Sequence, residues 1–600
     1  MAKVTTILKR SEQKPADCWS VEDLFPSDEA WEAEFQACQE IPGQLSAYRG
    51  RLGSSAATLL EYLTFNEDIW VRLRKLSVYA MLRQDEDTAN AVYQEMSGRS
   101  QSFFVRLSSA SAFEEPELVA IPEEELEQFY AKEPGLEKYR RYLTRARRER
   151  DHILSQAEED LLAAAGEVIG GSSRIYTSFS NADMKFPPVA DSDGIEHPLT
   201  QGSYISLMES PDRTLRENAF KAFYKVYDSF RNGLASMLNT EIRKNVFLSR
   251  ARKYDSALQA SLSPVEIPEP VYHNLIEAVH RNLDKMYRYM GLRKKAMGLD
   301  ELHMYDIYAP MLPEADRAIS FEQAKEYVLA ATQVLGPEYH KVIERSFRER
   351  WMDIYENEGK RSGAYSCGCP VHPFVLLNHK DTLNSAFTLA HELGHAMHSY
   401  LSDLNQPPIY SNYVLFVAEV ASTCNEALLM RYLLDHTTDK RERAVLINYF
   451  LEQFRTTLYR QTMFAEFELK THQLAETGEA LTAQKFSEIY YELNKLYYGD
   501  NVVVDQDIAM EWSRIPHFYR RFYVYQYATG FSAAIALSQR ILTGGQEAVD
   551  QYLKFLSGGC STDPISLLKI AGVDMSTPEP VNEALALFGE LIGELETLLT

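Results

Sequence analysis

Apolar residues recur at three- and four-residue spacing along most of the chain, and this spacing predicts amphipathic helices. The clearest such segments are residues 31–45, 59–82, 157–167, 211–245, 270–297 and 445–474. Glycine (28) and proline (24) gather in a few places, as expected of long helices joined by short connections. No stretch approaches the length of uncharged apolar sequence that crosses a membrane. The chain is therefore predicted to be mainly α-helical.

Three segments break the helical pattern. From Arg174 to His197 the sequence loses helical spacing and carries Asp193-Gly194, a hairpin turn signal, so we predict a β excursion there. Prolines 264, 268 and 270 mark a second joint. From Gly363 to Lys380 a β-branched and apolar core bounded by glycine and proline predicts two short strands directly before a helix. The predicted organisation is an N-terminal helical region (1–173), a β-hairpin joint (174–202) and a large C-terminal domain (203–600).

Composition narrows the classes of protein that fit. Hydrophobic residues make up 45% and charged residues 25% of the 600 residues, which is typical of a globular chain with a large core. Lys and Arg (62) against Asp and Glu (86) leave a net charge of −24, so nucleic acid and anionic membrane surfaces are not expected partners. Six cysteines are too few to stabilise a chain of this size through disulfide bonds. Cys367 and Cys369 lack the second cysteine pair that a structural zinc site needs. With no apolar export segment at the amino terminus, we expect a reduced, cytoplasmic protein.

The predicted helix Leu383–Leu401 contains the sequence His391-Glu392-Leu393-Gly394-His395. At about 100° per residue the two histidines lie roughly 40° apart on one face and about 6 Å apart along the axis. Two imidazoles so placed can converge on one zinc ion at about 2.0–2.1 Å. Glu392 lies about 100° round from His391, where a base for a zinc-bound water belongs. The spacing therefore predicts a catalytic zinc site, and we expect the domain 203–600 to be a zinc peptidase domain.

A catalytic zinc ion needs a third protein ligand and one open position. His398 shares the helical face, but its Cα lies about 10 Å along the axis from that of His391, which would strain the geometry. Glu419 is a lone charge in the apolar predicted helix Tyr413–Leu433, where it would be costly unless it bound a metal or formed a buried ion pair. Glu426, seven residues further on the same face, would either accept a hydrogen bond from a ligand histidine or be solvated.

These residues resemble a known family. The sequence HELGHAMH, with 23 residues between His395 and the first glutamate of FVAEVASTCNE, closely resembles the thimet-type (M3) metallopeptidases, and specifically their oligoendopeptidase F branch. The strand segment beginning at Gly363 and the C-terminal sequence IPHFYRRFYVYQYATGFSAA fit the same family. The resemblance runs from about Arg174 to Leu591, with a weaker helical match before it.

The resemblance implies a fold and an activity. It implies a helical ellipsoid split by a deep substrate channel, with a small β-sheet beside the metal-binding helix in the zincin manner. It also implies one Zn²⁺ per chain and cleavage of internal bonds in short, unstructured oligopeptides. In the resemblance, the family's metal ligands match His391, His395 and Glu419. Its general base matches Glu392, and its supporting carboxylate matches Glu426.

The resemblance also implies substrate contacts. His517 and Tyr525 match residues that contact the substrate carbonyl, and Tyr523 and Tyr527 are weaker matches. The substrate backbone is expected to add as an extra strand beside the predicted β segment, at Gly363, Ala364 and Tyr365.

Two other functions stay open on the sequence. A carboxypeptidase or dipeptidyl carboxypeptidase would need a basic residue for the substrate's C-terminal carboxylate, and Arg514, Arg520 and Arg521 lie near His517 in the sequence. A non-catalytic peptide-binding protein is disfavoured by the intact Glu392, because a structural zinc site closes its fourth position and needs no base. The sequence sets neither the cleavage preference nor the oligomeric state.

Overall fold

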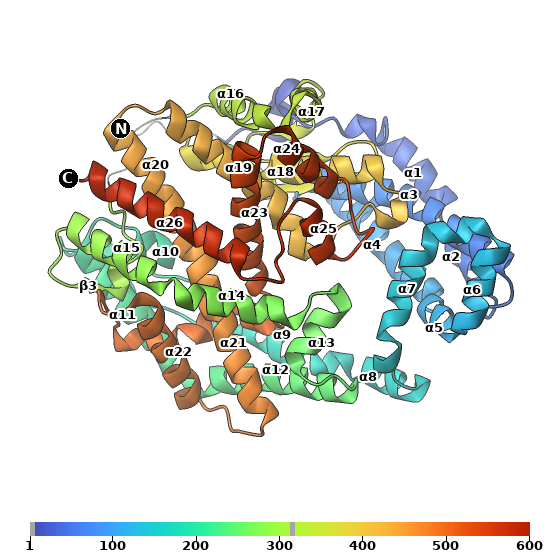
Figure 1. Ribbon diagram of the computed structural model, residues 1–600, viewed down its shortest axis with the longest axis horizontal. Coiled ribbons are helices and arrows are strands. Elements are labelled where there is room, and N and C mark those ends of the chain that lie inside the picture. Colours follow the sequence, from blue (N-terminus) through green and yellow to red (C-terminus); the bar gives the residue numbers. More distant parts are fainter. Residues whose placement is uncertain (1–6, 313–317) are drawn as a thin grey trace. The chain divides into compact units, whose positions relative to one another are not determined.

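The computed structural model of the chain describes residues 7–312 and 318–600 (Figure 1). Long helices dominate it, which confirms the predicted mainly α fold. The described chain forms two compact units, each assembled from segments distant in sequence. The first unit comprises residues 7–150, 318–432 and 537–572, and the second comprises residues 151–312, 433–536 and 573–600.

The first unit carries the longest helix and the predicted metal-binding helix. Its longest helix, α3, is capped by Ser55, whose side chain accepts a hydrogen bond from the backbone of Thr58. The helices of this unit are α1 (Asp28–Ala37), α2 (Ile41–Ser46), α3 (Ala56–Glu86), α4 (Ala91–Ser111), α5 (Glu114–Ala120), α6 (Glu123–Lys132), α7 (Arg140–Arg148), α16 (Phe321–Thr332), α17 (Pro337–Arg348), α18 (Leu383–Asn405), most of α19 (Leu415–His436), α24 (Gly545–Leu556) and α25 (Pro564–Ile570).

The second unit is also helical, and its core is rich in aromatic side chains. Tyr204 and Phe223, for example, stack with their ring centroids 3.9 Å apart. Its helices are α8 (Gln156–Ile169), α9 (Gly171–Ser178), α10 (Tyr204–Met208), α11 (Arg213–Ser229), α12 (Arg231–Ala251), α13 (Ala257–Leu262), α14 (Glu269–Arg281), α15 (Leu283–Ala296), α20 (Lys440–Gln453), α21 (Arg460–Glu476), α22 (Ala483–Tyr498), most of α23 (Tyr525–Thr543) and α26 (Glu579–Leu598).

Three small sheets accompany the helices in the described chain. In the first unit, β4 (Met352–Asp353), β6 (Phe374–Leu376) and β5 (Tyr365–Cys367) form one sheet in that order, with β6 parallel to β4 and antiparallel to β5. This confirms the two strands predicted within 363–380 and makes β5 an edge strand. In the second unit, β3 (Leu302–His303) pairs in parallel with β7 (Val502–Val503), and β1 (Val189–Ala190) forms a hairpin with β2 (Glu196–His197).

The prediction of a β excursion from Arg174 to His197 is wrong for its first half. The hairpin confirms only the second half, where Gly194 takes the left-handed conformation (φ +80°) of the predicted turn. Residues Gly171–Ser178 are α-helical, and the helix continues as one π turn at Phe179–Asp183. Tyr176 and Ser180, four residues apart, are both buried, so burial at helical spacing prevails over the β propensity of this stretch.

Several predicted helices are interrupted. The segment 31–45 is two helices, because Pro42 stands in the first turn of α2, where its missing N–H costs no hydrogen bond. The segment 211–245 divides at Phe230 into α11 and α12, and 445–474 contains a π turn at Phe454–Tyr459. Among the residues described, no helix has the length and apolar character needed to cross a membrane.

The predicted boundaries near residues 173 and 202 do not coincide with the limits of the compact units, which interleave along the chain. The sequential three-part division stays a prediction about domains, as does the deep substrate channel.

Candidate metal centre

The helix α18 begins directly after the small sheet of the first unit. Thr382 caps it by accepting a hydrogen bond from the backbone of Ser385, and one face of the helix, with Leu389, Leu393 and Ala396, is buried. The predicted helix Leu383–Leu401 is thus confirmed and extends to Asn405. The HExxH sequence lies in the middle of the helix, away from its fraying ends, so its side chains start from a rigid backbone.

Gly394 allows α19 to approach α18 closely. A Cβ at this position would lie 2.5 Å from the Cα of Ser422 and 2.6 Å from the carbonyl oxygen of Ala421. The two helices are also joined by Asn425, whose side-chain amide donates to the carbonyl of Ala390 (3.2 Å). This close packing brings the predicted ligand on α19 next to the histidines on α18.

Three side chains converge at this contact. The Nε2 atoms of His391 and His395 are 3.2 Å apart, and Oε2 of Glu419 lies 3.4 Å from the first and 3.6 Å from the second. A tetrahedral ion with ligand bonds of about 2.0–2.1 Å separates its ligand atoms by roughly 3.3 Å. The three atoms therefore have the spacing of a single metal site and can hold a metal ion. The donor set, two imidazoles and one carboxylate, leaves a fourth position of a tetrahedral ion free.

The charges at this site are arranged to receive a cation. Burial lowers the pKa of His391, but hydrogen bonds to Glu419 and Glu426 outweigh burial and raise that pKa to about 10. Burial raises the pKa of Glu419, but His391 and His395 outweigh burial and hold it well below its ordinary value. The carboxylates therefore supply a negative field at the point where the imidazole nitrogens meet.

Glu392 is at this site but does not belong to the ligand group. Its side chain is buried (6% exposed), and its Oε2 has no hydrogen-bond partner among the residues described. Burial raises the pKa of this carboxyl, and the neighbouring His391 and His395 oppose the rise. A buried carboxylate oxygen left without a partner is costly unless something else meets it, and a water held by a metal would do so.

His398 does not join the ligand group. Its ring is fully buried and stacks on Tyr413 with the centroids 3.7 Å apart, and neither ring nitrogen has a partner within the described part of the chain. Burial lowers the pKa of His398 to about 3, so it is neutral. Of the two candidates for a third ligand, the geometry favours Glu419.

Glu426 orients one of the histidines. Its Oε1 lies 2.9 Å from Nδ1 of His391, which fixes the ring with Nε2 directed at the ligand group. We predict that Glu426→Gln lowers the affinity for zinc by about 10–100-fold, the usual cost of losing such a partner. Competition with a chromophoric chelator measures this affinity. An unchanged affinity would mean that the contact plays no part in metal binding.

The predicted strand residues lie at the edge of the small sheet. Gly363 (φ +87°) and Ala364 precede β5, and Asn378 donates to the carbonyl of Gly363 (2.8 Å). Tyr365 begins β5, and its hydroxyl donates to Asp85 (2.7 Å). Since β5 pairs with β6 on one side only, its other edge is the one to which an extended peptide can add.

The predicted carbonyl-contacting residues belong to the second unit and fall into two groups. His517, Tyr523 and Tyr527 form a ring cluster, in which the Tyr527 hydroxyl lies 3.5 Å from Nε2 of His517. Tyr525 is not in this cluster. It is 1% exposed, and its ring packs on Tyr272 with the centroids 5.0 Å apart. The three tyrosines alternate along 523–527, so the sequence does not show that Tyr525 differs from the other two. The difference arises because the chain enters α23 at Tyr525 and the side-chain directions change there.

A buried carboxyl in the same unit supports this cluster and was not identified from the sequence. Phe522 has a left-handed backbone (φ +46°), which is strained for a bulky residue. Its N–H donates to Oε1 of Glu468 (2.8 Å), which is 2% exposed. Burial raises the pKa of Glu468 to about 8, against the opposing hydrogen bond from Phe522. Nothing in the sequence distinguishes this glutamate on α21 from a solvated one.

We predict that Glu468→Ala lowers the free energy of unfolding by about 1–3 kcal/mol, because it leaves the Phe522 N–H unpaired, whereas Glu468→Gln retains the acceptor. Since the pKa is raised in the folded state, the native protein keeps a proton that the unfolded chain has released between about pH 4.5 and 8. This group therefore makes stability fall as pH rises through that window. Urea-unfolding midpoints at pH 5 and pH 8 should differ less for Glu468→Gln than for the wild type. An equal difference would contradict this role.

Comparisons with known proteins identify the family of this chain. The family model described as "Peptidase family M3" matches residues 206–587, and the one described as "Oligopeptidase F" matches residues 117–186. The chain is 46% identical over 598 residues to oligopeptidase PepF of Bacillus subtilis, covering 100% of this chain and 89% of that protein.

Solved structures give the same result. A putative peptidase from Chlamydophila abortus is 36% identical with a TM-score of 0.94, covering 99% of this chain and 100% of that one. The oligoendopeptidase-F of Enterococcus faecium is 38% identical with a TM-score of 0.74, covering 95% of this chain and 99% of that one.

A helical fold with an HExxH helix and a glutamate from the next helix defines a metallopeptidase of the zincin type. With these matches, the chain belongs to peptidase family M3, in its oligopeptidase F branch. The predicted enzyme class, a metalloendopeptidase, is thereby confirmed.

Proposed function

We propose that this protein is a zinc-dependent oligoendopeptidase that hydrolyses internal peptide bonds of short, unstructured peptides. One Zn²⁺ per chain would be held by His391, His395 and Glu419. The observation that carries the proposal is the convergence of these three ligand atoms, which lie 3.2–3.6 Å from one another. Beside them, the buried Glu392 has one carboxylate oxygen without a hydrogen-bond partner among the described residues.

The proposed reaction depends on Glu392. When bound, zinc supplies a Lewis acid that lowers the pKa of a water toward about 7 and polarises the scissile carbonyl. Oε2 of Glu392, which has no partner among the described residues, takes the proton of the attacking water and then delivers it to the nitrogen of the leaving amine. Glu426 holds His391 in the tautomer that directs Nε2 at the metal.

We further propose that His517 donates a hydrogen bond to the carbonyl oxygen as negative charge develops there. Burial lowers the pKa of His517, so it is a neutral imidazole whose Nε2 meets the Tyr527 hydroxyl. The resemblance assigned the second donor to Tyr525, but its burial against Tyr272 supports Tyr527 instead, with Tyr523 as the third ring of the group.

The free edge of β5 supports a substrate bound mainly through its backbone. A peptide adding beside Gly363, Ala364 and Tyr365 would gain main-chain hydrogen bonds that make little distinction between side chains. We therefore expect broad sequence preference close to the scissile bond.

Mass spectrometry of a length-graded peptide set and one unfolded protein, incubated with and without a chelator, tests this function. We expect chelator-sensitive internal cuts in the short peptides, with the long chain spared. Release of single residues or dipeptides from the C-terminus alone would overturn it in favour of a carboxypeptidase-type enzyme.

The basic residues near His517 give that alternative limited support. Arg514 is paired with Glu511 (2.8 Å), and Arg521 donates to the carbonyl of Ala260 (2.9 Å). Arg520 is exposed and lies over the ring of Tyr523, 4.4 Å from its centroid, so it is the residue best placed to meet a carboxylate. Oligopeptides are the proposed partners. A cytoplasmic location and the absence of nucleic-acid and membrane partners stay predictions from the sequence.

A further inference from the structure

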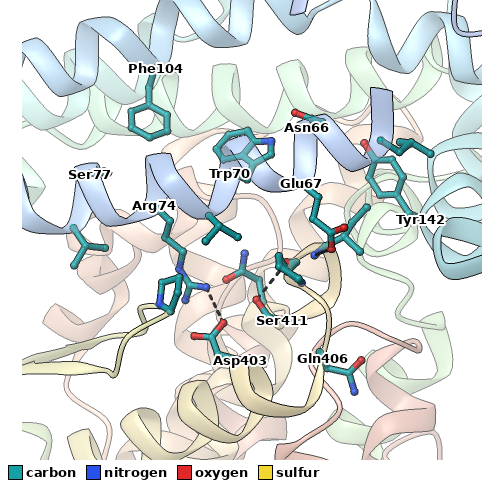
Figure 2. Close-up of a pocket in the computed structure, with 17 residues that line it drawn as sticks. Asn66, Glu67, Trp70, Arg74, Ser77, Phe104, Tyr142, Asp403, Gln406 and Ser411 are labelled. Carbon is teal, nitrogen blue, oxygen red and sulfur yellow. Dashed lines mark hydrogen bonds and ion pairs between the residues drawn. The ribbon is translucent and has the colours of Figure 1, made fainter. Parts of the chain in front are cut away.

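A groove in the first unit runs along one face of α3 (Figure 2). Its volume is about 640 Å³. The α3 residues that line it recur at three- and four-residue spacing from Leu63 to Val78, which corresponds to roughly 22 Å of helix. The opposite wall is the end of α18 and the segment from Gln406 to Asn412. A groove of this length accommodates about six residues of extended peptide.

A second cavity connects the groove to the edge strand β5. A smaller cavity is lined by β5 residues Ser366 and Cys367 and by Ser399, one turn beyond His395 on α18. This cavity shares four lining residues with the α3 groove, namely Arg74, Val78, Ser411 and Asn412. A peptide that lies beside β5 at the metal centre therefore meets the α3 groove when it is extended in one direction.

The groove is suited to apolar side chains. Trp70, Phe104 and Ile409 line it, and the ring centroids of Trp70 and Phe104 lie 6.1 Å apart. Its charged groups are already paired. Arg74 binds Asp403 at 2.8 Å, as Figure 2 shows, and Glu67 binds Lys138. A charged substrate side chain would compete with these pairs, whereas an apolar one would not.

One carboxylate oxygen in the wall of the groove has no hydrogen-bond partner among the described residues. Oδ2 of Asp403 is buried, and no group in the described chain hydrogen-bonds to it, since Arg74 contacts the other oxygen.

We propose that the α3 groove is a specificity subsite for a large apolar side chain of the oligopeptide substrate, about four residues to the amino-terminal side of the scissile bond. This inference rests on the proposed function. It makes Trp70 the principal specificity-determining residue.

The distance and direction follow from the elements that join the two sites. Asp403 lies eight residues after His395 on α18, or about 12 Å along the axis, which an extended peptide spans in about four residues. The carboxyl end of β5 leads toward the groove, because a Cβ on Gly368 would lie 2.7 Å from the Cβ of Ser399. A peptide antiparallel to β5, the commoner pairing, would have its amino-terminal part on that side.

Matched peptides test the subsite. Two internally quenched decapeptides would differ only in the fourth residue before the cleaved bond, Leu in one and Gly in the other. We expect kcat/KM to be about tenfold higher for the Leu peptide with the wild-type enzyme, and this ratio to fall toward one in Trp70→Ala. Asp68→Ala, an exposed position on the same helix outside the groove, should keep the wild-type ratio. An unchanged ratio in Trp70→Ala, or a preference on the carboxyl side of the bond, would overturn the proposal.

Fluorescence gives a second measurement that needs no turnover. Of the five tryptophans, Trp70 is 47% exposed and the other four are at most 2% exposed, so a peptide in the groove changes chiefly the emission of Trp70. Titrating the Leu peptide into Glu392→Gln protein should give a saturable emission change that is absent from the Glu392→Gln, Trp70→Phe protein. The same change in both proteins, or none in either, would overturn the subsite. If the wild type cleaves no peptide but the emission of Trp70 still changes with added peptide, the proposed function fails, whereas peptide binding in the groove is supported.

Discussion

Glu392→Gln is expected to lower kcat/KM for peptide cleavage by about 10²–10⁴-fold while zinc remains bound. The substitution keeps the size of the side chain but removes the carboxylate that accepts the proton. We expect the upper part of this range, because one carboxyl both takes the proton of the water and returns it to the amine. Cleavage of a fluorogenic peptide and metal analysis of the same sample measure the two effects together.

The same change at an exposed glutamate provides the control. Glu124→Gln, on the surface of α6, should retain wild-type activity and zinc content. If Glu392→Gln retained its zinc and cleaved peptides at the wild-type rate, the proposed role of Glu392 would be excluded.

Glu419→Ala is expected to have a comparably large effect by a different route. It removes one of three ligand atoms and leaves two imidazoles with no carboxylate opposite them. The affinity for zinc should fall by more than the roughly 10–100-fold expected for Glu426→Gln, and activity at ordinary zinc concentrations should be lost. Zinc content after dialysis, followed by activity at increasing zinc concentration, measures this.

His398→Phe tests whether His398 is a metal ligand or only lies near the site. Phenylalanine retains a ring to stack on Tyr413 and removes two nitrogens that have no partner among the described residues. This variant should keep its zinc. Loss of zinc from His398→Phe together with its retention by Glu419→Ala would reverse the assignment of the third ligand.

The candidate metal site was predictable because much of it is local in sequence. Two histidines four residues apart on a helix fix their own geometry. The cost of a lone carboxylate in an apolar helix made Glu419 a candidate for the third ligand, and the family resemblance matched it to that position. The sequence did not reveal why α19 comes so close. That closeness depends on Gly394, which permits contact with Ser422, and on the Asn425 hydrogen bond to Ala390.

Other features depend on contacts between distant segments, which no local pattern records. The tyrosines at 523, 525 and 527 look equivalent in sequence, yet only the first and last share a cluster with His517. Glu468 is 54 residues from Phe522 and meets it only in the folded unit. The helix at Gly171–Ser178 was missed because the β-prone residues Ile175, Tyr176 and Thr177 stand together in the sequence. In the structure the residues buried there, Ser172, Tyr176 and Ser180, are four apart, which is helical spacing.

Stepwise addition of zinc to metal-free protein, with peptide cleavage followed at each step, tests the central claim most directly. The account predicts no internal cleavage at the start, a linear rise, and a break at one zinc ion per chain. Full activity in protein shown to lack metal would contradict it, and so would a protein saturated with zinc that cleaves no peptide.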